Sequence, residues 1–163
     1  VRDDGDRSRV EALQALCLEL GLREKRDNVA EDWDVVFRTN ISVSDMQTML
    51  GQATVGLHTM KEEHFGINVV EFMAAGAVPL AHRSGGPLMD IVTPLDGQRT
   101  GMLASDIDSY AMALKEIFDL SADERRKITA AAREAVRARF AQEAFEAAIA
   151  DAMVAPLRRG GGR

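Results

Sequence analysis

Two glutamates eight positions apart, Glu63 and Glu71, are the residues of this sequence best suited to chemistry. Between them lies Gly66, which has no Cβ and so lets a ligand approach the backbone closely. If a helix begins near Gly66, its first N–H groups have no partner within the helix, and the helix dipole adds partial positive charge that suits a phosphate. Carboxylates accept hydrogen bonds, so their natural partners are hydroxyl groups. The stretch therefore predicts a site for a diphosphate joined to sugar hydroxyls.

The same residues have simpler explanations. Glutamates at this spacing occur by chance, Glu71 can be an exposed helix residue, and many helix starts are merely capped. His58 and His64 can be loop histidines bound to backbone, and without a third ligand they predict no metal site. The spacing by itself leaves both interpretations open.

A strand, a loop, a helix and a second strand are predicted around the two glutamates. Residues 55–58 form an apolar run typical of a strand, a helix follows from about Gly66 to Gly76, and a second strand begins at Val78. In parallel sheets, ligands bind beyond the carboxyl ends of strands, where loops enter helices. Residues 58–66 are expected to be a loop of this kind.

Upstream, apolar residues at helical spacing predict a helix over residues 8–20, with Gly21 as its C-terminal cap. Cys17 lies on the apolar side of this helix and is expected to be a buried, unreactive thiol. Residues 23–32 are expected to be a loop, and the β-branched and aromatic run 33–38 predicts a strand.

Capping signals predict three more helices. Ser44 followed by Gln47 resembles a capping box and opens a short helix whose methionines are expected to fill the core. Asp106 is expected to cap a second helix. Ser121 with Glu124 forms another capping box before an alanine- and arginine-rich helix.

A last strand is expected at residues 101–104, and a final helix from about residue 142 to 154, ending before Pro156 because proline lacks an N–H group. Strands that alternate with helices across short loops indicate an α/β fold, Rossmann-like, with a mainly parallel sheet and a helical C-terminal segment. We expect one domain over residues 1–156 and a flexible tail over 157–163.

Composition excludes several classes of protein. With 163 residues the chain is long enough for one domain with a core. Its net charge of -6 argues against a general nucleic-acid binder. The single cysteine cannot form an internal disulfide, which indicates a reducing compartment. No apolar run reaches the ~18 residues that a membrane span needs.

The central stretch also resembles a known family. Residues 63–76, EHFGINVVEFMAAG, are similar to the E-x7-E signature of the retaining glycosyltransferases of family 4, which have the GT-B fold of two Rossmann-like halves. The branch of that family that transfers mannose from GDP-mannose to a dolichol-linked oligosaccharide is resembled more closely still, by residues 56–60 (GLHTM), 63–67 (EHFGI), 80–82 (LAH), 84–87 (SGGP) and 90–92 (DIV). The detailed resemblance covers residues 54–92.

The resemblance implies roles for the matching residues. Glu71 would accept hydrogen bonds from the ribose hydroxyls, and Glu63, the catalytic candidate, would face the donor sugar. The other donor-binding candidates are His58, the backbone amides around Phe65, Gly66 and Ile67, the glycine pair Gly85 and Gly86, and Arg38. No metal or other cofactor is implied, because basic residues and helix dipoles can stabilise the leaving diphosphate.

In this family an arginine and a lysine of the C-terminal half neutralise the diphosphate, and an N-terminal half binds the acceptor. Neither precedes Val1. We therefore expect an N-terminally truncated C-terminal half of a GT-B fold, soluble and inactive alone, without membrane or nucleic-acid contacts of its own. The complete protein would act at the cytosolic face of the endoplasmic reticulum membrane. The alternatives are a non-catalytic nucleotide-sugar-binding or interaction module, and a family 4 transferase that uses another nucleotide sugar.

Overall fold

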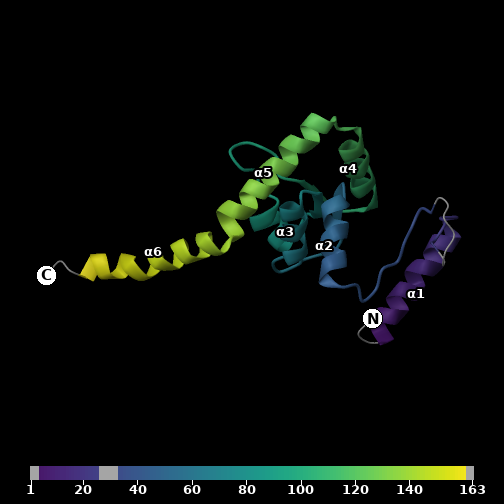
Figure 1. Ribbon diagram of the computed structural model, residues 1–163, viewed down its shortest axis with the longest axis horizontal. Coiled ribbons are helices and arrows are strands. Elements are labelled where there is room, and N and C mark those ends of the chain that lie inside the picture. The colour runs from purple at the N-terminus through teal and green to yellow at the C-terminus, as the bar shows by residue number, and fades with distance from the viewer. Residues whose placement is uncertain (1–3, 26–32, 161–163) are drawn as a thin grey trace. The chain divides into compact units, whose positions relative to one another are not determined.

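A computed structural model describes residues 4–25 and 33–160 of the chain, with side chains described for residues 5–25 and 33–153. The chain divides into two compact units, Val1–Met46 and Gln47–Arg163. Figure 1 labels their elements. None of the helices, as far as the structure describes them, is long and apolar enough to cross a membrane.

The first unit contains helix α1, Asp4–Glu19, which confirms the predicted N-terminal helix. Gly21, with φ 69°, follows it in the left-handed region that glycine adopts readily. The Leu22 N–H donates to the Cys17 carbonyl at 2.9 Å and so closes the helix end. Cys17 is buried, as expected, with 8% of its surface exposed.

The strand predicted at residues 33–38 is wrong. Only an isolated parallel bridge between Glu24 and Val35 forms there. A β-branched run becomes a strand only where a neighbouring strand continues the hydrogen bonding, and the described residues provide a single point of pairing. The segment is held by a side chain instead, because the Asp34 carboxylate accepts from the backbone N–H of Arg23 at 2.9 Å. The larger part of the predicted 23–32 loop lies outside the described residues.

Helix α2, Val43–Gln52, forms where a short helix was predicted, but its cap differs. Ser42, and not Ser44, accepts the hydrogen bond from the Asp45 N–H at 3.1 Å. Both serines stand three positions before an acceptor side chain, so the sequence offered two competing capping boxes. The expected core role of the methionines is also wrong, since α2, described in full, has no buried residue.

The second unit is built on a parallel sheet in the order β1-β2-β3. Its strands are β1, Val55–His58, β2, Val78–His82, and β3, Met102–Ala104. Helix α3, Ile67–Ala75, connects β1 to β2, and a π-helical turn, η1, Pro87–Ile91, lies between β2 and β3. The predicted strand-loop-helix-strand unit and the α/β class are confirmed.

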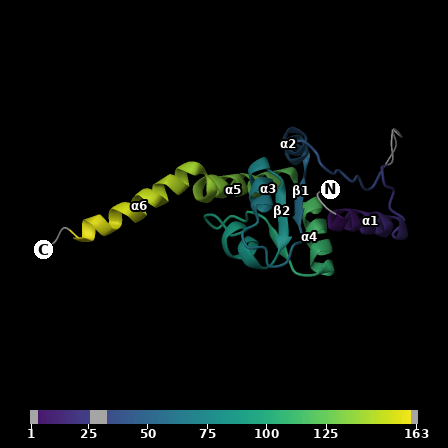
Figure 2. The same ribbon diagram turned by 90° about the horizontal axis from the view of Figure 1, so that it is seen from below.

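Three further helices follow the sheet: α4, Ile107–Asp119, α5, Ala122–Phe140, and α6, Gln142–Gly160. Helices α3 and α5 pack on one face of the sheet and α4 on the other, as Figure 2 shows. Side chains of β2 alternate between the two faces, so this strand contributes to both cores. The α3–α5 core includes Val69, Met73, Ala81, Ala132 and Ala135, and the α4 core includes Val78, Leu80, Met102, Ala104 and Ile117.

Helix α6 runs through Pro156 to Gly160, so the predicted end before the proline is wrong. A proline inside a helix forfeits one backbone hydrogen bond and crowds the preceding turn, which kinks or weakens a helix. In α6 the helix nevertheless continues past Pro156.

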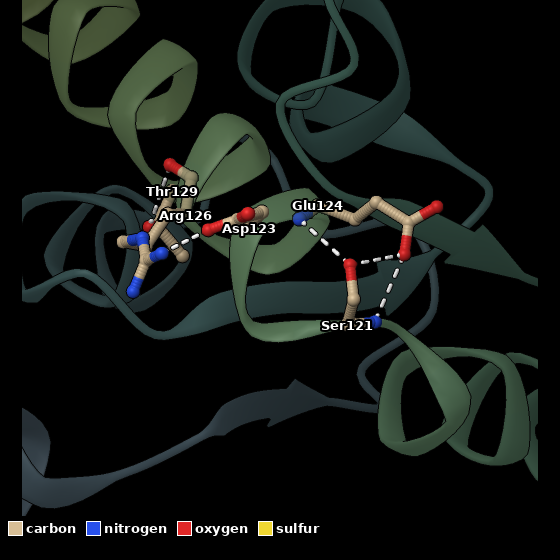
Figure 3. Close-up of polar contacts among 5 residues, drawn as sticks. All are labelled: Ser121, Asp123, Glu124, Arg126 and Thr129. Carbon is tan, nitrogen blue, oxygen red and sulfur yellow. Dashed lines mark hydrogen bonds and ion pairs between the residues drawn. The ribbon is translucent and has the colours of Figure 1, made fainter.

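Reciprocal hydrogen bonds cap α4 and α5 as predicted. The Glu124 N–H donates to the Ser121 hydroxyl at 3.2 Å, while the Ser121 N–H donates to the Glu124 carboxylate at 2.9 Å. Figure 3 draws both contacts as dashed lines. At α4, the Ser109 N–H donates to the Asp106 carboxylate at 2.8 Å. Both helix starts therefore have side-chain acceptors for otherwise unpaired amides.

These caps predict a pH dependence of stability. The Ser121 side chain, then its backbone N–H, lowers the pKa of Glu124, and the Ser109 backbone N–H, then its side chain, lowers the pKa of Asp106. Because both pKa values are lowered by folding, the stabilisation is full above the ordinary values of 4.5 and 3.8 and is lost as pH falls through the folded values. Urea unfolding should show that the free energy of unfolding decreases as the pH is lowered through this acidic range.

The double variant Asp106→Asn and Glu124→Gln keeps acceptor atoms at both caps but cannot ionise there. Its unfolding free energy should change less steeply with pH than that of the native chain. Identical slopes for the two proteins would contradict the assignment.

Candidate functional site

The loop between β1 and α3 lies at the carboxyl ends of the parallel strands, where α/β folds bind ligands. The turn that follows β2 holds this loop. The Gly86 N–H donates to the Glu63 carbonyl at 2.9 Å. The Glu62 N–H donates to the Ser84 hydroxyl at 2.7 Å. Two loops from neighbouring strands are thus joined directly at the place where the first glutamate of the pair stands.

The glycine pair makes this junction sterically possible. A Cβ on Gly85 would lie 2.2 Å from the Glu63 carbonyl oxygen, and one on Gly86 would lie 2.2 Å from the Phe65 carbonyl oxygen. The sequence predicted that the pair lets a loop come close to a donor. The close approach in the structure is to the backbone of the loop that carries Glu63, and contact with a donor stays a prediction.

Helix α3 begins at Ile67, as predicted, with Gly66 as its N-cap. Gly66 has φ 97° and ψ 55°, a conformation that side-chain-bearing residues rarely adopt. No side chain caps this helix start, in contrast to α4 and α5. The backbone N–H groups of Ile67 and Asn68, in the first turn, have no acceptor within the helix, and a helix start of this kind suits an anion.

Glu71 lies in the second turn of α3 and is partly buried. Within the described part of the chain, its carboxylate makes no hydrogen bond or ion pair. A half-buried carboxylate without a partner is available to hydroxyl donors of a ligand.

Glu63 and His58 face each other. His58 ends β1, and its Nε2 lies 3.7 Å from Oε2 of Glu63. The His58 side chain is buried, and its Nδ1 has no hydrogen-bond partner among the described residues. The interpretation of His58 as a loop histidine bound to backbone is therefore wrong: its ring contacts the first glutamate instead. The Tyr110 hydroxyl donates to the His58 carbonyl at 2.9 Å and fixes the strand end.

A cavity of about 850 Å³ opens beside these strand ends, toward α4. Lys61 lines it together with polar residues from the end of β2 and from the residues that follow β3. The lining residues are Leu57, Thr59, Lys61, His82, Ser105, Asp106, Ile107, Asp108, Tyr110, Ala111 and Leu114. Neither glutamate of the pair lines this cavity, so it is a neighbour of the carboxylate site.

The remaining candidates are placed as follows. Phe65 is 44% exposed and packs edge-on against Phe140, with 5.6 Å between ring centroids. Ile67 is exposed at the first position of α3. Arg38 is exposed and belongs to the first unit, so its contact with a base stays a prediction. In the described part of the chain, no group of three or more metal-ligating side chains is close enough to hold an ion.

The sequence analysis used two residues of this region, His82 and Ser84, only for the family resemblance and predicted no role for them in the site. The Ser84 hydroxyl binds the Glu62 amide, and His82 Nδ1 lies 2.8 Å from the same hydroxyl. Their position directly after β2 and before the glycine pair was the available signal, because polar residues at the carboxyl end of a parallel strand belong to the ligand-binding edge.

A parallel sheet with an uncapped helix start and acceptor carboxylates at its carboxyl edge is typical of Rossmann-like nucleotide-binding domains. The chain belongs to the glycosyl transferases group 1 family, whose model matches residues 5–135. The predicted family is thereby confirmed.

Two curated relatives are GDP-Man:Man(3)GlcNAc(2)-PP-Dol alpha-1,2-mannosyltransferases. The Mus musculus protein is 46% identical over 148 residues, covering 91% of this chain and 28% of the relative. The Homo sapiens protein is 43% identical over 145 residues, covering 89% of this chain and 27% of the relative. The chain thus spans little more than a quarter of the length of these relatives.

Solved structures support the same fold. The C-terminal domain of a glycosyl transferase group 1 family protein from Francisella tularensis matches with a TM-score of 0.65 at 18% identity, over 86% of this chain and 66% of that chain. Sucrose-phosphate synthase from Thermosynechococcus elongatus matches with a TM-score of 0.68 at 23% identity, over 98% of this chain and 36% of that one. These likenesses confirm the predicted fold of a GT-B half.

The glycine junction yields a prediction for stability. Gly86→Ala places a methyl group against the Phe65 carbonyl, so the backbone must shift, and we expect a loss of about 1 to 3 kcal/mol in unfolding free energy. Gly51→Ala is the control, because a Cβ there meets nothing within 4 Å and alanine favours the surrounding helix. Denaturant titration that shows equal stability for Gly86→Ala and the native chain would contradict the packing argument.

Proposed function

We propose that this chain is the donor-binding part of a retaining mannosyltransferase that moves mannose from GDP-mannose to a dolichol-linked oligosaccharide. The observation that carries the proposal is the uncapped start of α3, with a partnerless carboxylate, Glu71, on the helix and a second, Glu63, in the loop before it. The names of the curated relatives supply the sugar, the base and the lipid carrier.

In this proposal the diphosphate lies at the N-terminus of α3. The unpaired amides of the first turn donate to its oxygens, and the helix dipole favours its negative charge. Gly66 contributes by its lack of a side chain, because a Cβ there would already contact Pro87 at 3.3 Å. Glu71 accepts hydrogen bonds from the ribose hydroxyls, and the donor sugar extends toward Glu63.

Transfer begins as the bond between the anomeric carbon and the diphosphate oxygen breaks. The α3 amides stabilise the charge that develops on the leaving diphosphate. An acceptor hydroxyl forms the new bond to the anomeric carbon from the same face of the sugar, and its proton passes to a phosphate oxygen. Glu63, partly buried beside His58, stabilises the positive charge that develops on the sugar. No metal ion is required in this scheme.

We assign acceptor binding to the portions of the longer relatives that this chain does not match. We further propose that the reaction takes place at the cytosolic face of the endoplasmic reticulum membrane, and the dolichol-linked acceptor in the names of the relatives supports the choice of this membrane. The second candidate function is transfer from another nucleotide sugar, because Arg38, the residue predicted to contact the base, belongs to the first unit. Nucleotide titrations separate the two.

Isothermal titration of the full-length protein should show tighter binding of GDP than of UDP or ADP. Glu71→Ala should weaken GDP binding by about 1 to 3 kcal/mol, because the ribose hydroxyls lose a buried acceptor. Glu143→Ala, at an exposed position of α6, is the matched control and should bind as the native protein does. Equal affinity for the three nucleotides would end the GDP-mannose proposal, and an unchanged GDP affinity in Glu71→Ala would end the ribose assignment.

Glu63→Gln keeps the size of the side chain but removes its charge. Mannose transfer from GDP-mannose should slow by about tenfold or more, equivalent to ~1.4 kcal/mol of transition-state stabilisation. Binding of GDP, which lacks the mannosyl group that would contact Glu63, should be unchanged. A variant that transfers mannose at the native rate would show that Glu63 has no catalytic role, and one that loses GDP affinity would show that it binds the nucleotide.

A further inference from the structure

A chain of hydrogen bonds crosses the carboxyl edge of the sheet. The Glu62 N–H donates to the Ser84 hydroxyl at 2.7 Å, and the Ser84 hydroxyl lies 2.8 Å from His82 Nδ1. His82 Nε2 lies 3.3 Å from the carbonyl oxygen of Ser105. The chain thus joins the loop after β1, the end of β2 and the residue that follows β3.

The donors and acceptors in this chain fit a single direction. A carbonyl oxygen only accepts, so the hydrogen of the imidazole must be on Nε2 of His82. In neutral imidazole Nδ1 is then an acceptor, and the hydroxyl hydrogen of Ser84 points to it. The oxygen of Ser84 is left to accept from Glu62. Each group makes the bond that its chemistry allows.

The bond to Glu62 has a backbone consequence. Glu62 has φ 53°, in the left-handed region that residues with a side chain rarely adopt. Such a conformation persists where its surroundings hold it. Ser84 holds the Glu62 amide, and Gly86 holds the carbonyl of Glu63, the next residue. The direction of the Glu63 side chain therefore depends on the turn after β2.

We propose that His82 and Ser84 are positioning residues for sugar transfer. His82 orients the Ser84 hydroxyl, Ser84 fixes the strained Glu62 backbone, and the Glu62 backbone aims Glu63 at the donor sugar. This inference rests on the proposed function. Glu71 lies on α3, outside the hydrogen-bond chain, so the chain affects the transfer step and leaves the ribose contact intact.

Two pairs of variants of the full-length protein test the role of this chain of hydrogen bonds. Ser84→Ala removes the hydroxyl and Ser84→Thr retains it. His82→Leu removes the imidazole, whereas His82→Asn retains an acceptor near the position of Nδ1. The control is Arg83→Met, at the position between the two. This change removes the hydrogen bond from the Arg83 side chain to the Leu103 carbonyl, and among the described residues that side chain makes no hydrogen bond or ion pair with the Glu62 loop.

For Ser84→Ala and His82→Leu, we expect kcat for mannose transfer to fall by about ten- to a hundredfold, since small displacements of a positioned group are costly. The Kd for GDP should stay within about threefold of the native value, because the ribose contact does not depend on the chain. Ser84→Thr and His82→Asn should recover most of kcat, and Arg83→Met should keep it.

Two measurements do not depend on activity. The Glu62 amide should exchange its hydrogen faster in Ser84→Ala than in the native protein and in Ser84→Thr. The ¹⁵N chemical shifts of His82 should show the neutral tautomer with hydrogen on Nε2.

A native kcat in Ser84→Ala, a Ser84→Thr variant no better than Ser84→Ala, or a hydrogen on Nδ1 of His82 would each overturn the proposal. A native protein that binds no nucleoside diphosphate would end the proposed function. The Glu62 exchange rates and the His82 tautomer would then still support or overturn the positioning of this loop.

Discussion

The contact on which the site depends is one of backbone against backbone. The carbonyl oxygens of Glu63 and Phe65 occupy the space that a Cβ on Gly85 or Gly86 would need. Strands β1 and β2 run in parallel, with His58 opposite Ala81, so their outgoing loops meet at one edge of the sheet. Two segments packed this closely leave no room for a side chain between them. The position of Glu63 is therefore set by the turn after the neighbouring strand as much as by its own loop.

The helix ends around the site are satisfied in different ways. Helices α4 and α5 begin with reciprocal side-chain caps, whereas α3 begins with a glycine and open amides. The other end of α3 is closed, because Arg133 of α5 donates to the carbonyls of Ala74 and Ala75, the latter at 2.7 Å. Gly76 permits this, since a Cβ there would lie 2.0 Å from the guanidinium. The helix is thus anchored at its C-terminus and left free to bind at its N-terminus.

Local signals predicted much of this fold. The strand at residues 55–58, the start of α3 at Gly66 and the caps at Asp106 and Ser121 depend on neighbours within a few positions, which the sequence shows directly. The errors arise where local signals compete or are incomplete. Two serines offered equivalent boxes before α2, and the run at 33–38 has the composition of a strand without a partner to extend its pairing.

In the candidate site, too, the features that depend on residues close in sequence were predicted, and the contacts between distant residues were not. Glu63, Gly66 and Glu71 were found because they share one stretch of chain, and α3 fixes how they follow one another. The links of Ser84 to Glu62 and of Gly86 to Glu63 join positions more than twenty residues apart. Such links exist only after the two strands pair, so composition and spacing do not reveal them. Arg38 is a candidate of a third kind, since only its place at the end of a predicted strand suggested it.

The two glutamates are held by different kinds of structure, and this has a consequence for specificity. Glu71 stands on a helix that is fixed by a buried core on the sheet, with Val69 and Met73 fully enclosed. Because many contacts hold this helix in place, a single substitution elsewhere displaces the helix only a little. Glu63 stands in a loop fixed by a few hydrogen bonds and two glycines, where a single substitution displaces the backbone. In the proposed function the nucleotide end of the donor is therefore held by helix α3, which single substitutions displace little. The sugar end is held by the loop that carries Glu63, which single substitutions displace more easily. On this proposal a change of sugar would require alteration of the loop and its supporting turn, while the helix assigned to the nucleotide would stay as it is.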